Sequence, residues 1–272
     1  MTKLAIRLSN KISFYDFPKE RNLHTTPIPI LGGFALLVSI LVNIFMFTQW
    51  EWSPFTAGCV GAFLIFLIGL YDDKYVLRPW LKILLQSMVI TFLYYHHIRI
   101  EFITWPSLSH PIFFASSVSF LITQIWMIVI INMFNIIDGI DGLAVGISCL
   151  TSIILFFVSL SVSPLIISYL LCSMIGSTGM FLKFNFHPAK IFLGDSGALL
   201  LGYLFAICSI LGVLKSTISF SILLFVFAIP IMDLVLSVIR RGLKGKNIFY
   251  PDLEHIHHQL VRRGLSVRKT TI

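Results

Sequence analysis

The chain has 272 residues, of which 57% are hydrophobic, against about 45–50% in an ordinary soluble domain. Only 12% are charged, where about 25% is usual. This composition excludes a soluble globular enzyme, and the 25 phenylalanines exclude a disordered chain, which is poor in aromatic residues. The four cysteines lie inside apolar runs without metal-ligand spacing, so the sequence predicts neither a disulfide framework nor a cysteine metal site.

Long apolar runs dominate the sequence. A hydrocarbon layer about 30 Å thick is crossed by ~20 mostly apolar helical residues, which satisfy their own backbone hydrogen bonds. We therefore expect an all-α, polytopic integral membrane protein with about eight transmembrane helices. The predicted spans are 30–47, 54–71, 81–95, 115–134, 143–160, 164–184, 197–214 and 217–239.

Lysine and arginine fall almost entirely on one side of this path. Of the 20 basic residues, 18 sort to the side that holds both termini, and only Arg99 and Lys215 fall opposite. The positive-inside rule makes that side cytoplasmic. We therefore expect a multi-pass protein of the inner (cytoplasmic) membrane without a cleaved signal peptide. Its parts are a basic cytoplasmic N-terminal segment (1–29), a transmembrane helical domain (30–240) and a cytoplasmic C-terminal arm (241–272).

The acidic residues follow the same asymmetry, although they contribute little to the insertion rule. Every aspartate lies on or near the expected cytoplasmic side, and only Glu51 and Glu101 face the other way. A transporter more often places ionisable groups near the bilayer midplane along a path. The pattern instead indicates an active site built from cytoplasmic loops and helix ends.

Two adjacent carboxylates, Asp72 and Asp73, end the second predicted span. The dipole at the C-terminal end of a helix disfavours negative charge, so a cation is expected to offset it. A divalent metal ion, Lys74 or Lys82 would serve, and carboxylates beside a cation suit phosphate chemistry. The alternative is a solvated helix end.

Four polar residues follow at intervals of three, at the end of the fourth span: Asn132, Asn135, Asp138 and Asp141. The two aspartates share a helical face if the helix continues, but Gly139 and Gly142 are expected to interrupt it. Small residues after each aspartate let a ligand approach the backbone, and asparagine amides both donate and accept hydrogen bonds. The alternative is a polar loop without a ligand.

The segment Gly194-Asp195-Ser196-Gly197 follows Lys190 and runs into the seventh predicted span. A helix start with exposed N–H groups favours anions such as phosphate. Asp195 is equally consistent with a plain helix cap, so both interpretations stay open.

Three histidines, His255, His257 and His258, stand close together in the C-terminal arm. No cysteine lies near, and their spacing does not match the common zinc motifs. Contact with a phosphate or a sugar fits the surrounding positive charge better. The alternative is a basic tail bound to anionic lipid headgroups.

In this order, the four motifs resemble those of the polyprenyl-phosphate N-acetylhexosamine-1-phosphate transferase family. The segment Asp16-x-Pro18-x-x-Arg21-x-x-His24 is similar to the family's as well, so the resemblance runs from about 16 to 260. The His-Ile-His-His form resembles the bacterial branch that initiates O-antigen, common-antigen or teichoic-acid synthesis. The chain departs from the usual pattern at Leu253, where a basic residue is common, and at Ala198, where serine is common.

The resemblance implies transfer of N-acetylhexosamine-1-phosphate from a UDP-sugar to polyprenyl (undecaprenyl) phosphate, with release of UMP and with Mg²⁺ as cofactor. It implies the following roles by position: metal ligands Asp195 and Asp72; catalytic residues Asp72, Asp73, Asp138, Asp141, His255, His257 and His258; substrate-binding residues Asn132, Asn135, Lys74 and Lys190. Direct attack and a covalent aspartyl-phosphate both stay open, with Asp72 as the base in our preferred interpretation.

The expected partners are a UDP-N-acetylhexosamine, a polyprenyl phosphate lipid and the membrane, with no nucleic acid and with homodimerisation left open. Members of the family usually carry a further span before the segment that matches 16–24. Two alternative functions remain: a transporter or flippase for a lipid-linked sugar, and an inactive paralogue that serves as a scaffold.

Overall fold

The computed structural model describes residues 1–18, 26–47, 54–103, 110–162, 165–212 and 266–271, with short pieces between 227 and 242. Its longer helices are α2 (Gly32–Phe47), α3 (Pro54–Tyr75), α4 (Pro79–Tyr95), α5 (Ser116–Ile137), α6 (Leu143–Val162), α7 (Leu165–Asn185) and α8 (Gly194–Leu211). Two short helices, α1 (Thr2–Ile12) and α11 (Val267–Thr271), lie toward the termini. Two-residue strands form the antiparallel pairs β1 (Tyr15–Asp16) with β2 (Ile28–Pro29) and β3 (Phe102–Ile103) with β4 (Ile112–Phe113).

The all-α prediction is confirmed, and each of the first seven predicted spans corresponds to one of the helices α2 to α8. Five of them, α3 and α5 to α8, are long and apolar enough to cross a membrane, whereas α2 is a shorter apolar helix. The prediction for 217–239 lies largely outside the described residues. The protein is therefore a multi-pass helical membrane protein. Helix α1 was not predicted.

Helix α8 forms the centre of the bundle. Sixteen of its 18 residues are buried, which is expected of a helix that is hydrophobic on all sides. Neighbouring helices approach it closely where glycine replaces a side chain: a Cβ on Gly69 of α3 would lie 2.4 Å from the Cα of Ser196. A Cβ on Gly33 of α2 would lie 2.5 Å from the Gly197 nitrogen. Glycine thus brings α2 and α3 against the first turn of α8.

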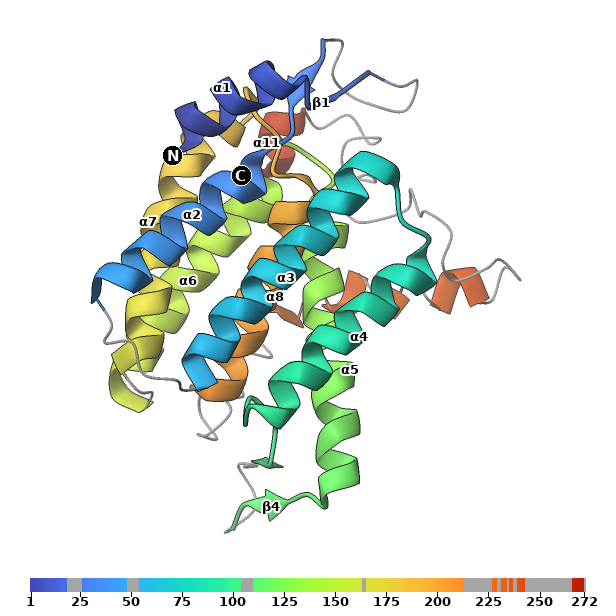
Figure 1. Ribbon diagram of the computed structural model, residues 1–272, viewed down its shortest axis with the longest axis vertical. Coiled ribbons are helices and arrows are strands. Elements are labelled where there is room, and N and C mark those ends of the chain that lie inside the picture. Colours follow the sequence, from blue (N-terminus) through green and yellow to red (C-terminus); the bar gives the residue numbers. More distant parts are fainter. Residues whose placement is uncertain are drawn as a thin grey trace.

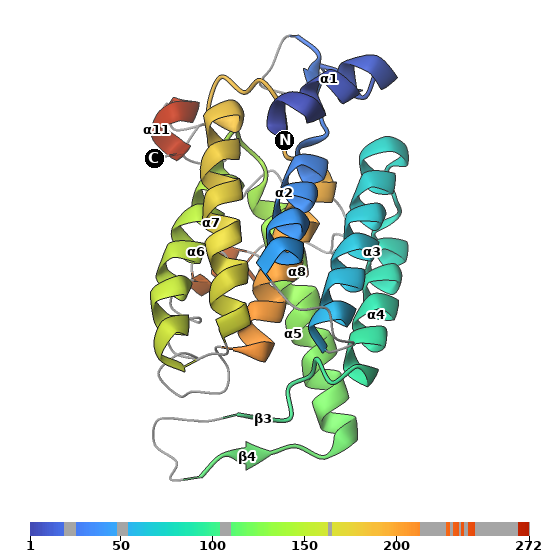
Figure 2. The same cartoon turned by 60° about the vertical axis from the view of Figure 1, so that its left-hand side comes forward.

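The two ends of the bundle differ. Figures 1 and 2 show α1 and α11 at one end, together with the loop that leads into α8. The β3–β4 hairpin lies at the opposite end. Because successive helices alternate in direction, the end of α3, the start of α4 and the start of α8 meet at the α1 end, and that end holds the polar motifs.

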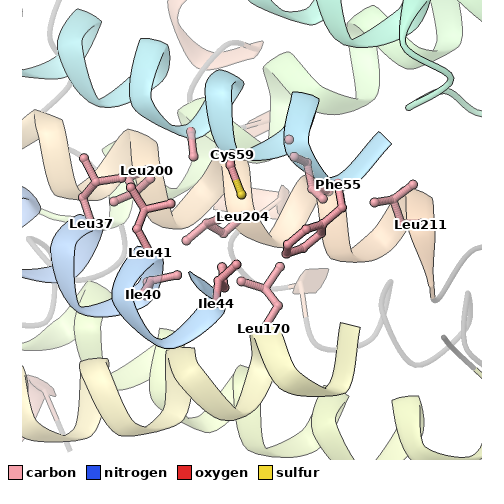
Figure 3. A pocket seen from close by; sticks show the side chains of 13 residues that line it. Leu37, Ile40, Leu41, Ile44, Phe55, Cys59, Leu170, Leu200, Leu204 and Leu211 are labelled. Atoms are coloured by element: carbon pink, nitrogen blue, oxygen red, sulfur yellow. The ribbon is translucent and has the colours of Figure 1, made fainter. Parts of the chain in front are cut away.

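A small cavity of about 20 Å³ lies among α2, α3, α7 and α8 (Figure 3). Its walls are apolar, with Leu37, Phe55, Cys59, Leu170 and Leu204 among the residues that line it. Apolar cavities of this kind remain dry, so this one has no polar groups to bind a polar substrate. The polar residues that could act on such a substrate lie at the α1 end of the bundle.

Candidate active site

Lys82, in the first turn of α4, is the centre of the polar cluster. Its Nζ lies 2.6 Å from Asp72 Oδ2 and 3.0 Å from Asp195 Oδ2, and it donates to Asn135 Oδ1 at 2.9 Å. Asn135 Nδ2 in turn donates to Asp195 Oδ1 at 2.7 Å. One buried ammonium group thus joins residues from α3, α4, α5 and α8.

The sequence predicted a cation beside Asp72 and Asp73 and offered two lysines for that place. The structure puts Lys82 next to Asp72, and the Lys82 side chain is only 11% exposed. Lys74 instead lies exposed on α3, with its Nζ 5.1 Å from the centre of the Tyr75 ring. The side chain of Asp195 remains 38% exposed, so a ligand has access to the cluster from the Asp195 side.

Asp73 caps the central helix. Its Oδ1 accepts the N–H of Asp195 at 2.7 Å, and its Oδ2 accepts the N–H of Ser196 at 3.1 Å. Leu193 precedes α8, and Gly194, the first residue of α8, has a φ of 72°, which glycine adopts without strain. The anion at this helix start is therefore Asp73, and Asp195 is not the cap, because its own carboxylate turns to Lys82 and Asn135.

Asn132 pairs with an amide side chain of the neighbouring helix α4. It lies one turn before Asn135 on α5, and its Nδ2 donates to Gln86 Oε1 of α4 at 2.7 Å. This amide pair links α4 to α5 one helical turn beyond Lys82. The sequence predicted that Asn132 and Asn135 both bind substrate, whereas the structure places Asn135 against Asp195 and Asn132 against Gln86.

Asp138 and Asp141 do not share a helical face, because α5 ends at Ile137. Asp138 is the C-cap residue, and Asp141 lies beyond it in the loop. Burial raises the pKa of Asp138 well above its usual range, and the negative charges of Asp195, Asp73 and Asp141 raise it further. Like charges close to a carboxyl group disfavour its ionised form, so a cation placed among these four aspartates would favour ionisation of Asp138.

Two further residues near Asp141 escaped the sequence analysis. His187 Nδ1 lies 2.8 Å from Asp141 Oδ2, and Asn185 Oδ1 accepts the N–H of Gly142 at 3.1 Å. The segment Phe-Asn-Phe-His-Pro carries no sequence motif that indicates a site, and it comes close to Asp141 only when α6 and α7 pack together. The side chain of Lys190, expected to bind substrate, is exposed.

The segment before α2 and the segment before α8 are joined by main-chain hydrogen bonds. The N–H of Phe192 donates to the carbonyl of Pro29 at 2.8 Å. The N–H groups of Gly32 and Gly33 donate to the carbonyls of Phe192 and Leu193, both at 3.0 Å. Pro29, Gly32 and Gly33 thus hold the segment before α2 against the start of α8.

Several predicted site features remain outside this description. His255, His257 and His258, together with Arg21 and His24, lie outside the described residues. Within the described part of the chain, no three His, Cys, Asp or Glu side chains form a ready-made metal site. The roles of all these residues stay predictions.

The sequence profile described as "Glycosyl transferase family 4" matches residues 55–213, more than half of the chain. The chain belongs to this family. The matched range contains every member of the Lys82 cluster, from Asp72 to Asp195. The family resemblance predicted from the motifs is therefore confirmed.

Similar proteins come from several bacteria. A protein of Bacillus subtilis named "Probable undecaprenyl-phosphate N-acetylglucosaminyl 1-phosphate transferase" is 36% identical over the whole chain and 76% of its own length. "Undecaprenyl-phosphate alpha-N-acetylglucosaminyl 1-phosphate transferase" of Thermotoga maritima is 30% identical over 97% of the chain and 78% of its own length. "Decaprenyl-phosphate N-acetylglucosaminephosphotransferase" of Mycobacterium leprae is 29% identical over the whole chain and 76% of its own length.

Proposed function

We propose that this protein transfers N-acetylglucosamine-1-phosphate from UDP-N-acetylglucosamine to a polyprenyl phosphate and releases UMP, as the initiating step of cell-surface polysaccharide synthesis. The observation that carries the proposal is Lys82, held between Asp72 and Asp195 at an accessible helix end. The names of the relatives support the acceptor and the sugar. The UDP donor follows from the motif resemblance.

The reaction joins two anionic substrates. An oxygen of the lipid phosphate attacks the β-phosphorus of the UDP-sugar, the bond from that phosphorus to the bridging oxygen breaks, and UMP leaves. Phosphoryl transfer depends on positioning and on neutralisation of charge more than on covalent chemistry. The Lys82 ammonium suits this task because it is held in place by Asp72, Asn135 and Asp195. Asp72 remains our preferred base for the acceptor phosphate.

The donor set also fits Mg²⁺. The carboxylates of Asp72 and Asp195 both contact Lys82, and Asp73 and Asp138 add two more acidic groups nearby. Magnesium is usually held by one or two carboxylates together with substrate phosphates and waters, so a three-ligand protein cage is not required. Asp195 and Asp72 would hold the ion, which would neutralise the diphosphate and polarise its P–O bonds.

The decisive experiment is a transfer assay with the purified protein. We expect polyprenyl phosphate and radiolabelled UDP-N-acetylglucosamine to give a labelled lipid and stoichiometric UMP, with activity lost in EDTA and restored by Mg²⁺. A parallel reaction with UDP-N-acetylgalactosamine tests the choice of sugar. Release of no UMP from either donor would contradict the proposal and would favour a scaffold or a transporter.

We further propose that the site faces the cytoplasm, with both termini on the same side. The support is the sequence, in which 18 of the 20 basic residues sort to the side of the membrane that holds both termini. Reporter fusions in the 48–53 loop and after Ile272 test the orientation. An external signal from the terminal fusion would overturn it.

A further inference from the structure

The loop after α5 and the loop after α7 form one hydrogen-bonded unit around Asp141. Its Oδ2 meets His187 Nδ1 at 2.8 Å and accepts the N–H of Ala189 at 3.2 Å. The next residue, Gly142, donates its N–H to Asn185 Oδ1 at 3.1 Å. Two segments more than 40 residues apart in sequence are thus fixed to each other.

The C-terminal helix α11 holds the same unit from a third direction. Thr271 Oγ1 donates to the main-chain carbonyl of Asp141 at 3.0 Å. The Arg268 guanidinium lies 6.0 Å from the centre of the Phe186 ring. Hydrogen bonds therefore constrain both the side chain and the backbone of Asp141, which is not expected of a plain polar loop.

The arrangement commits only one oxygen of the Asp141 carboxylate. His187 and Ala189 both bind Oδ2, and no described residue donates a hydrogen bond to Oδ1. The Asp141 side chain remains 20% exposed and that of His187 37% exposed. An ionised carboxylate accepts hydrogen bonds and donates none, so Oδ1 suits an N–H or O–H group of a ligand.

We propose that His187 is a positioning residue of the donor site, which holds Asp141 through Oδ2 so that Oδ1 accepts a hydrogen bond from the sugar nucleotide. The inference rests on the proposed function and adds a residue to it. With Asp141 ionised, Nδ1 carries the proton, and the Nδ1–H group donates a hydrogen bond to Oδ2. A carboxylate fixed before the substrate arrives loses less conformational freedom on binding.

Three substitutions test this role. His187→Ala and His187→Phe remove the hydrogen bond, and phenylalanine also preserves the ring volume. His187→Asn keeps an N–H donor at a position close to Nδ1. We expect the alanine and phenylalanine variants to raise the KM for UDP-N-acetylglucosamine about tenfold, the effect of losing one hydrogen bond to a charged group. We expect the asparagine variant to stay within about threefold of wild type, and kcat to change less than about threefold in all three.

The matched control is His97→Asn. His97 is an exposed histidine at the opposite end of the bundle, and its φ of 64° is a conformation that asparagine tolerates. We expect its KM and kcat to equal those of wild type. Thermal unfolding of every purified variant shows whether His187 contributes to stability as well.

An unchanged KM in both the alanine and the phenylalanine variants would overturn the proposal. So would an asparagine variant no better than alanine, or a fall in kcat and thermal stability at constant KM, since these assign His187 to folding alone. Failure of the proposed function has a different signature, because the wild-type protein would then release no UMP. Calorimetric titration with UDP-N-acetylglucosamine would still measure whether His187→Phe weakens binding relative to wild type.

Discussion

The two ends of the bundle use charge in different ways. At the α1 end, Lys82 contacts Asp195 across 113 residues of sequence, and both contact partners on other helices. At the β3–β4 end, Arg99 contacts Glu101 only two residues away, at 2.7 Å and with Glu101 53% exposed. The first cluster exists only when four helices are assembled, whereas the second is a local surface pair.

This difference teaches where function is to be sought. A surface ion pair contributes little to stability because water and salt screen it. A buried cation among several carboxylates is costly to form and sensitive to the loss of any partner. Buried charge clusters of this kind concentrate at functional sites, and substitutions at the two ends should therefore have very different effects.

The largest effect is expected for Asp195→Asn. The change removes one negative charge that faces Lys82 and, in the proposed function, a ligand of the metal ion. Loss of several kcal/mol of transition-state stabilisation lowers transfer activity by more than about 100-fold in the labelled-lipid assay. Glu101→Gln, at the opposite end, is the control and should keep full activity. Activity of Asp195→Asn within about tenfold of wild type, or ~1.4 kcal/mol, would remove Asp195 from the catalytic machinery.

Lys82→Met should destabilise the protein as well as inactivate it. The carboxylates of Asp72 and Asp195 would lose their shared cation, and breaking a buried ion pair typically costs about 3–5 kcal/mol of unfolding free energy. Thermal unfolding in detergent measures the loss. Adding Asp72→Asn should restore part of the stability but not the activity. Lys74→Met, at an exposed lysine, should leave the stability unchanged, and equal losses in the two methionine variants would contradict this account.

Gly69→Ala tests the packing that brings the cluster together. Its Cβ would lie 2.4 Å from the Ser196 backbone, so α3 would move away from α8. Overpacking of this kind costs about 1–3 kcal/mol of stability. Gly176→Ala on α7 is the matched control, because its Cβ would meet no described atom within 4 Å. A Gly69→Ala variant as stable as Gly176→Ala would show that the close approach is not required.

The smallest effect is expected for Arg99→Gln. The exposed pair with Glu101 contributes less than about 1 kcal/mol, and the residue lies far from the Lys82 cluster. Unfolding temperature and transfer activity should both remain close to those of wild type. A large loss of activity would show that the two ends of the bundle are coupled.

Much of the fold could be predicted because each helix is a contiguous apolar segment. The helices α2 to α8 all match predicted spans, and their alternating direction places Asp72, Asp138 and Asp195 at the same end. The end of α5 was harder to predict. Gly139 and Gly142 signalled an interruption, but only the backbone shows that the helix ends at Ile137 and leaves Asp141 in the loop.

The sequence by itself determined the helical membrane architecture, the family and the acidic motifs that mark the candidate site, because hydropathy and motif spacing belong to single segments. Only the tertiary structure decided the partners. It selected Lys82 over Lys74, paired Asn132 with Gln86, and brought His187 to Asp141. These choices depend on the rotation of each helix and on the close glycine contacts around α8, which no single segment specifies.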